Sequence, residues 1–459
     1  MSKKLYILLL MSLSLPGSFS LAQQIPPDVL VRNLENSRAA LEQIEDSIGI
    51  SNVRLLESLE QLAESLIALN LYVEAHGVLD RAIQITRANE GLFTPMQRDL
   101  QVRKIENLIF QRDWESARAG MEHLNWLYVN KSLQIDAELI DDLFYLSELH
   151  IRGIGEDFIG QQSTHFRKAA TLNWAALNLA KALWGEHDPR LSPMAYRLVK
   201  QYHAQLVALE RGERISIELR EVVPGSGWVR ERKAVKQAFY LLGIQLLNQI
   251  KNIHANAEPP DRQGMAMADL YIGDWQVIFS RANDAKLSYS EGYAGLQAAG
   301  VDKARIDEFF VNPIVLPEAD FYAAVDVALL ARSPLQEGGS RPDVSTVPDS
   351  IQFSEWSRSF PHTQSPLADQ YADLEESARF ALYSFSLSGL NGYSRWINSS
   401  YRTGVGMARE LQVLDQFTVS PEEERALLGK LQTLRFRPPF VDGVAQSTSG
   451  TLRYNLAVE

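Results

Sequence analysis

Cysteine is absent from this sequence of 459 residues. The chain therefore cannot form disulfides or thiolate metal sites, and no cysteine is available to carry a lipid anchor. Basic residues are also in the minority, because 45 Lys and Arg stand against 57 Asp and Glu, a formal net charge of −12. This balance disfavours nucleic acid as a partner, since no dominant basic face is available to displace counterions from a phosphate backbone.

Motifs that carry chemistry are equally scarce. The eight histidines show no His-Glu-x-x-His or other paired metal-binding spacing, and we expect His123, His150 and His203 to be packed or surface side chains on helices. Residues 153–160 are too long for a dinucleotide fingerprint and are interpreted as a turn, as are residues 404–406. The sequence thus predicts no catalytic, cofactor-binding or metal-binding residue, and we expect a protein that is not an enzyme.

A long apolar run occurs only at the start of the chain. Two lysines precede an apolar segment, residues 5–15, and residues 20–22 supply a small-x-small end. This pattern is typical of a secretory signal peptide, here residues 1–22, cleaved before Gln23. The alternative is a retained membrane anchor, but a proline and a glycine interrupt the run before the roughly 20 residues needed to span a bilayer. We therefore expect a periplasmic protein without an integral membrane segment after cleavage.

Helical periodicity is abundant. Between residues 55 and 83 the apolar residues recur at helical spacing with a break near Asn70, which predicts two antiparallel helices. Small residues at Ala63 and Ala75 allow these helices to approach closely. The positions that follow the spacing of a tetratricopeptide repeat are Leu62, Ala63, Leu66, Tyr72, Ala75, Leu79 and Ala82.

The same offsets recur further along the chain. One copy places Ala117 where the first has Ala75, a shift of 42 residues, which is longer than the standard unit of about 34. Another copy places Gly273, Ala285 and Tyr289 at the spacing of Ala63, Ala75 and Leu79. The chain therefore resembles the tetratricopeptide-repeat (TPR) superfamily, which implies an α-solenoid of antiparallel helix pairs with a binding groove. An irregular helical bundle is the alternative.

The helical pattern ends before residues 334–350, which are rich in Pro, Gly and Ser. This composition predicts a linker between a helical repeat domain, residues 23–333, and a small α/β domain, residues 351–459. Within the second domain, residues 381–387 alternate as a strand does, and a turn signal follows at Asn391-Gly392.

The last part of the chain follows a recognisable order. Residues 421–434 have the apolar stripe of a short helix, and residues 452–458 alternate as a terminal strand. Between them, Phe436 stands between Arg435 and Arg437, so an extended backbone would point the ring inward and both guanidinium groups outward. Two prolines then end regular pairing, and Asp442-Gly443 signals a turn.

Helix, aromatic-x-Pro element and final strand in this order resemble the C-terminal domain of TonB energy transducers, although an unrelated small α+β domain is the alternative. TonB proteins also have an uncleaved N-terminal membrane helix and a long proline-rich spacer. The sequence has neither, so we do not expect the chain itself to transduce energy. An exposed sheet edge in such a domain could accept a strand from a partner.

The sequence as a whole predicts a mainly α fold, a TPR-like α-solenoid followed by a small α/β domain that resembles the TonB C-terminus. The predicted function is a non-catalytic periplasmic adaptor that binds an envelope protein or peptide. Two alternatives stay open, namely an envelope enzyme of unrecognised type, whose catalytic groups meet only in space, and a structural or oligomerising envelope protein.

Overall fold

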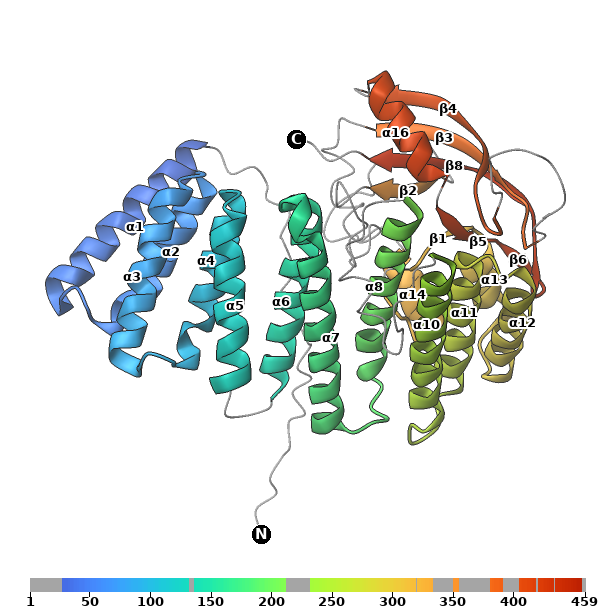
Figure 1. The fold of residues 1–459 in the computed structure, drawn as a ribbon, viewed down its shortest axis with the longest axis horizontal. Helices are drawn as coiled ribbons and strands as arrows, with labels where there is room; N and C mark the ends of the chain where they lie inside the picture. Colours follow the sequence, from blue (N-terminus) through green and yellow to red (C-terminus); the bar gives the residue numbers. More distant parts are fainter. Residues whose placement is uncertain are drawn as a thin grey trace, which may run out of the picture. The chain divides into compact units, whose positions relative to one another are not determined.

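A computed structural model describes residues 27–131, 136–211, 232–318, 320–332, 350–354, 380–390, 404–417, 420–432 and 434–455. The protein is mainly helical, and small sheets are formed in the C-terminal part (Figure 1). The chain divides into two compact units between Gln111 and Arg112. The predicted signal peptide lies outside the described residues, as does the predicted linker apart from Ser350, so the domain boundary at that linker stays a prediction.

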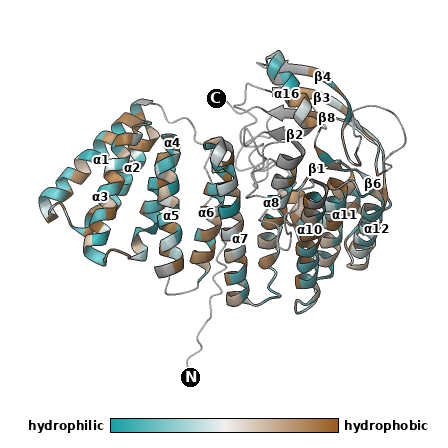
Figure 2. Cartoon of the chain, viewed as in Figure 1, coloured by the Kyte–Doolittle hydropathy of each residue, from teal (hydrophilic) through white to brown (hydrophobic). Residues whose placement is uncertain are grey.

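The first unit consists of helices that each bury one face. Hydrophobic and hydrophilic residues alternate along them (Figure 2), as expected of helices that face a core on one side. The predicted pair is confirmed, with the break at Asn70 in a left-handed conformation, φ 59°. Its core includes Leu59, Leu66 and Leu79. The helices are α1 (Pro27–Ile48), α2 (Leu56–Ala68), α3 (Tyr72–Glu90) and α4 (Arg98–Phe110).

The second unit continues with helices that pack mainly against their sequence neighbours. They are α5 (Trp114–Lys131), α6 (Ala137–Glu156), α7 (Gln162–Trp184), α8 (Leu191–Arg211), α10 (Arg232–Ala255), α11 (Arg262–Ile278), α12 (Ala282–Ala298), α13 (Lys303–Phe310) and α14 (Val325–Arg332). The predicted pair around Gly273 and Ala285 is confirmed as α11 and α12. Among the described residues, no helix combines the length and the apolar character needed to cross a membrane.

The C-terminal residues form a four-stranded sheet in the order β2-β8-β3-β4. Strand β2 (Ser350–Ser354) is parallel to β8 (Thr448–Asn455), whereas β3 (Phe380–Leu387) is antiparallel to both β8 and β4 (Arg409–Phe417). Helix α16 (Pro421–Leu431) packs Leu427 and Leu431 against Tyr383 and Phe385 of the sheet. The predicted strand at residues 381–387 and the short helix are therefore confirmed, as is the terminal strand as far as Asn455. Residues 456–458 and the turn signal at Asn391-Gly392 lie outside the described residues.

The Arg-Phe-Arg stretch is strand β5 (Arg435–Arg437), and it pairs outside the four-stranded sheet. Its antiparallel partner is β1 (Ile314–Leu316), which follows α13, with Val315 opposite Phe436. Figure 1 shows these two strands between the larger sheet and helices α11 to α13. Beyond the two prolines, the Asp442-Gly443 turn joins β6 (Phe440–Val441) to β7 (Val444–Ala445), with positive φ at both turn residues.

Candidate functional site

Arg437 is buried, with 1% of its surface exposed, so the prediction that it points to solvent is wrong. The predicted position of Phe436 is confirmed, because its ring is fully buried and stacks on Phe385 with 5.3 Å between centroids. Successive side chains of a strand point to opposite sides. Since Phe436 faces the sheet, Arg437 faces helix α11, which occupies the side that was expected to be solvent. Arg435, also predicted to point outward, is half-buried.

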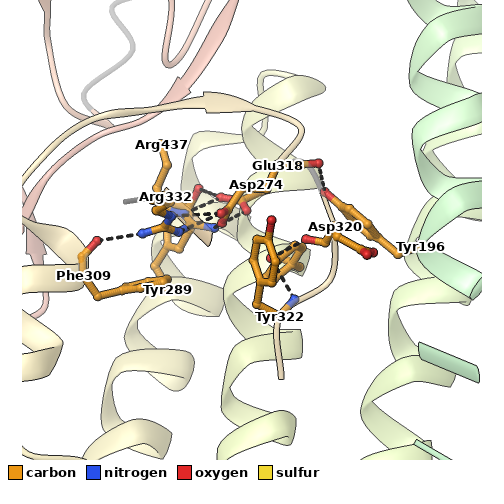
Figure 3. A network of polar contacts seen from close by, with 10 residues as sticks. Tyr196, Asp274, Tyr289, Phe309, Glu318, Asp320, Tyr322, Arg332 and Arg437 are labelled. Carbon is orange, nitrogen blue, oxygen red and sulfur yellow. Dashed lines mark hydrogen bonds and ion pairs between the residues drawn. The ribbon is translucent and has the colours of Figure 1, made fainter. Parts of the chain in front are cut away.

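The Arg437 side chain meets two buried carboxylates. Its Nε donates to Asp274 Oδ1 at 2.8 Å and its Nη2 donates to Asp274 Oδ2 at 2.5 Å, a bidentate pair (Figure 3). The same Nη2 donates to Glu318 Oε1 at 2.6 Å. Asp274 lies on α11 and Glu318 follows β1, so one guanidinium joins a strand near the end of the chain to two segments more than a hundred residues earlier.

A second arginine completes the charge balance. Arg332, on α14, donates from Nη2 to Glu318 Oε2 at 2.7 Å and from Nη1 to the Phe309 carbonyl at 3.2 Å. On the other side, the Tyr289 hydroxyl donates to Asp274 Oδ1 at 2.7 Å. Two guanidinium groups thus face two carboxylates, and such pairing is what makes buried charge tolerable. We call Asp274, Tyr289, Glu318, Arg332 and Arg437 the buried charge network.

The electrostatics of the network favour the ionised forms of Glu318 and Arg437, whereas burial raises the pKa of Asp274 despite the nearby Arg437 guanidinium. Burial alone would raise the pKa of Glu318, but the Arg332 and Arg437 guanidinium groups outweigh it and hold that pKa below its ordinary value. Burial alone would lower the pKa of Arg437, yet Asp274 and Glu318 raise it well above its ordinary value. The network is therefore a set of buried groups that pair with one another, although Arg437 Nη1 has no hydrogen-bond partner among the described residues, and it is suited to hold chain segments together.

Tyrosines on neighbouring helices hold the segment that follows β1. The Tyr196 hydroxyl, on α8, donates to the Glu318 carbonyl at 3.3 Å. The Tyr271 hydroxyl, on α11, donates to the Asp320 carbonyl at 2.7 Å and accepts from the Tyr322 amide at 3.2 Å (Figure 3). These hydrogen bonds fix the main chain at and after Glu318, and they thereby position the Glu318 carboxylate that accepts from Arg437.

The turn predicted at residues 404–406 also contacts β5. Gly406 accepts a hydrogen bond from the Phe436 amide at 2.7 Å and has a positive φ of 67°. A Cβ at this position would lie 2.6 Å from the Phe436 carbonyl oxygen and 2.5 Å from a Val277 methyl group. Only glycine fits here, and it lets the segment before β4 close over β5.

A second buried polar group has the connectivity of a Ser-His-Asp triad. Ser192 Oγ lies 3.0 Å from His254 Nε2, and His254 Nδ1 lies 2.8 Å from Asp261 Oδ2. Ser192 and His254 are both 1% exposed, and Asp261 also caps α11 by accepting from the Gly264 amide. Because the hydroxyl is not presented to a substrate, we assign these residues a structural role that ties α8 to the turn between α10 and α11.

A third buried polar group lies between α6 and α7, where His150 approaches His165. His150 is packed, as predicted from its place on a helix. The interpretation of residues 153–160 as a turn is wrong for residues 153–156, which lie in α6. A Cβ on Gly153 would lie 2.4 Å from the His165 ring, so glycine leaves the room that the imidazole fills. Within the described part of the chain, no cluster of His, Asp and Glu is arranged to hold a metal ion.

Comparison with known proteins does not assign the chain to a family. No family model matches the chain. No curated protein matches it either. Among solved structures, the crystal structure of BtubC (BKLC) from P. vanneervenii is similar at 12% sequence identity, with 68% of this chain and 94% of that chain covered and a TM-score of 0.34.

Proposed function

We propose that the protein is a non-catalytic binding protein of the bacterial periplasm, an adaptor that holds an envelope protein or peptide. The observation that carries this proposal is the free edge of β4. Among the described residues β4 pairs with β3 alone, so the backbone on its other side is open to a further strand. An extended segment of a partner would extend the sheet there through main-chain hydrogen bonds.

The shape of β4 limits where a partner strand would pair. Glu410 has a positive φ of 54°, and the register with β3 shifts between Ser384 and Ser386. Such a bulge disturbs regular pairing at one end of an edge strand. A second register shift, between Leu382 and Tyr383, places Leu414 in a bulge as well, so regular pairing is available only on either side of this residue. Leu414 exposes 53% of its surface, so a partner would meet one apolar side chain there.

The two resemblances support the same proposal. TPR-like helix pairs imply a surface for protein segments, and the likeness to the TonB C-terminus implies strand addition at a sheet edge. The expected signal peptide supports a periplasmic location. The buried charge network adds a further reason. Strand β5 packs Phe436 against the four-stranded sheet and binds the helices through Arg437, so it would hold a partner of β4 in a fixed relation to those helices.

Site-specific photocrosslinking in intact cells tests the proposal. A photoreactive phenylalanine derivative at Leu414 is compared with one at Leu287, which is similarly exposed but lies on α12. We expect stronger labelling from position 414 than from position 287, and mass spectrometry should map the adducts of position 414 to one extended segment of a single envelope protein. Adducts of twice the chain's mass would instead assign β4 to self-association, and equal labelling from both positions would contradict a binding role for β4.

A further inference from the structure

Two buried histidines meet where α6 packs against α7. His150 Nδ1 lies 3.0 Å from His165 Nδ1, and the two residues are 3% and 0% exposed. His165 Nε2 lies 2.9 Å from Asp157 Oδ2, an oxygen that also accepts from Arg118 of α5. Imidazoles from two helices thus form a chain that ends on a carboxylate.

The order of the protons in this chain follows from its partners. An ionised carboxylate only accepts, so His165 carries its proton on Nε2 and donates it to Asp157. The Nδ1 of neutral His165 is then an acceptor, and His150 must carry a proton on Nδ1 to donate to it. Both imidazoles are neutral at neutral pH, because burial lowers the pKa of His150 to about 3 and lowers that of His165 despite Asp157.

Additional protons have no favourable place here. One proton adds a positive charge inside the packed helices near Arg118 and Lys168, whose charges are already paired with Asp157 and Glu122. A second proton leaves two N–H groups facing each other across 3.0 Å. We propose that His150 and His165 form an acid-sensitive lock between α6 and α7, closed at neutral pH and opened by acid.

The direction of the pH dependence follows from the linkage between proton binding and opening of the α6–α7 contact. In an opened state each imidazole has its ordinary pKa of about 6.5, so below that pH the open state binds protons that the closed state excludes. The stability of the contact is complete above about pH 6.5 and falls as the pH drops toward the pKa of about 3 that His150 has in the closed state. At pH 5, a single excluded proton favours opening by about 30-fold relative to neutral pH.

His254 provides an internal comparison. Its Nε2 lies next to the Ser192 hydroxyl, which donates to a neutral imidazole and can rotate to accept from a protonated one. Its Nδ1 donates to Asp261 whether His254 is neutral or protonated. A protonated His254 therefore keeps both hydrogen bonds, whereas doubly protonated His150 and His165 lose the hydrogen bond between them. We expect the α6–α7 contact to be more sensitive to acid than the contact between α8 and the α10–α11 turn.

Hydrogen exchange of the full chain at pH 7.5 and pH 5.0 tests the lock, with rates corrected for the intrinsic effect of pH. Amides of α6 and α7 should lose at least about 10-fold more protection than those of α11 and α12, which contain no histidine. Equal losses in the two helix pairs would overturn the proposal.

Substitutions separate the lock from general acid sensitivity. His150→Asn places an amide near the former Nδ1 that can donate or accept after a flip, and His165→Gln keeps a donor toward Asp157. Each variant should show a smaller acid loss in α6 and α7 than the parent chain, and the double variant should show none beyond that of α11 and α12. Full acid sensitivity in a variant that is protected normally at pH 7.5 would contradict the proposal. If the double variant does not fold, the single variants decide.

Discussion

The helix pairs α2–α3 and α11–α12 share one spacing of small residues but differ in what covers them. Ala75 and its counterpart Ala285 are both fully buried where the helices of each pair meet. One position after the small residue of the first helix, the Glu64 side chain is 59% exposed, whereas the side chain of its counterpart Asp274 is 4% exposed. The spacing thus specifies how two helices pack but not what lies on their outer face.

The difference arises because β5 lies against α11. Every residue from Ala266 to Ile278 is buried, so α11 has no solvent face for a charge. The second pair differs from the first at three equivalent positions. It has Gly273, Asp274 and Tyr289 where the first pair has an alanine, a glutamate and a leucine. A Cβ on Gly273 would lie 2.7 Å from the Tyr289 ring, so the glycine admits the tyrosine whose hydroxyl reaches Asp274.

A charged residue at the buried alanine position that the two helix pairs have in common should destabilise both pairs. We expect Ala75→Asp and Ala285→Asp each to lower the free energy of unfolding by about 4 kcal/mol or more, since an unpaired charge would be forced between packed helices. Hydrogen exchange within each pair measures the effect separately in the two compact units. Serine at the same positions serves as the control and should cost far less. Unchanged protection in either pair would show that its assigned spacing is wrong.

Removing the charge at the outer position should separate the two pairs. Asp274→Asn leaves Arg437 buried with one carboxylate fewer, and we expect a loss of about 3–5 kcal/mol. Glu64→Gln removes half of an exposed ion pair with Arg103 and should cost less than about 1 kcal/mol. Denaturant unfolding followed by exchange in α11 and α2 measures both, and similar losses would remove the distinction between the pairs.

Phe436→Ala tests the other face of β5. The ring is fully buried against Phe385, so its removal should cost about 3–5 kcal/mol in the second unit. Val441→Ala is the matched control on β6, where 57% of the residue is exposed, and it should change stability by no more than about 0.5 kcal/mol. A Phe436→Ala protein as stable as the control would mean that the β1–β5 register is incorrect.

Local periodicity was enough to predict the helix pairs, α16, β3 and β8. The 3.6-residue period of a helix and the two-residue period of a strand can both be recognised from residues close together in the sequence. The burial of Arg437 depends on Asp274, 163 residues away, and no local pattern encodes that contact. The same holds for Ser192 and His254, 62 residues apart. One signal was present for Arg437, since Asp274 lies within an otherwise mostly apolar stretch of α11 and a buried acid needs a partner.

A pair of double-mutant cycles tests most directly whether the Arg437–Asp274 pair, rather than the shared spacing, anchors β5 to the helices. One cycle combines Asp274→Asn with Arg437→Met, and the other combines Glu64→Gln with Arg103→Met. We predict a coupling free energy of about 2 kcal/mol or more for the buried pair and less than about 0.5 kcal/mol for the exposed pair. Equal coupling in the two cycles would contradict the account.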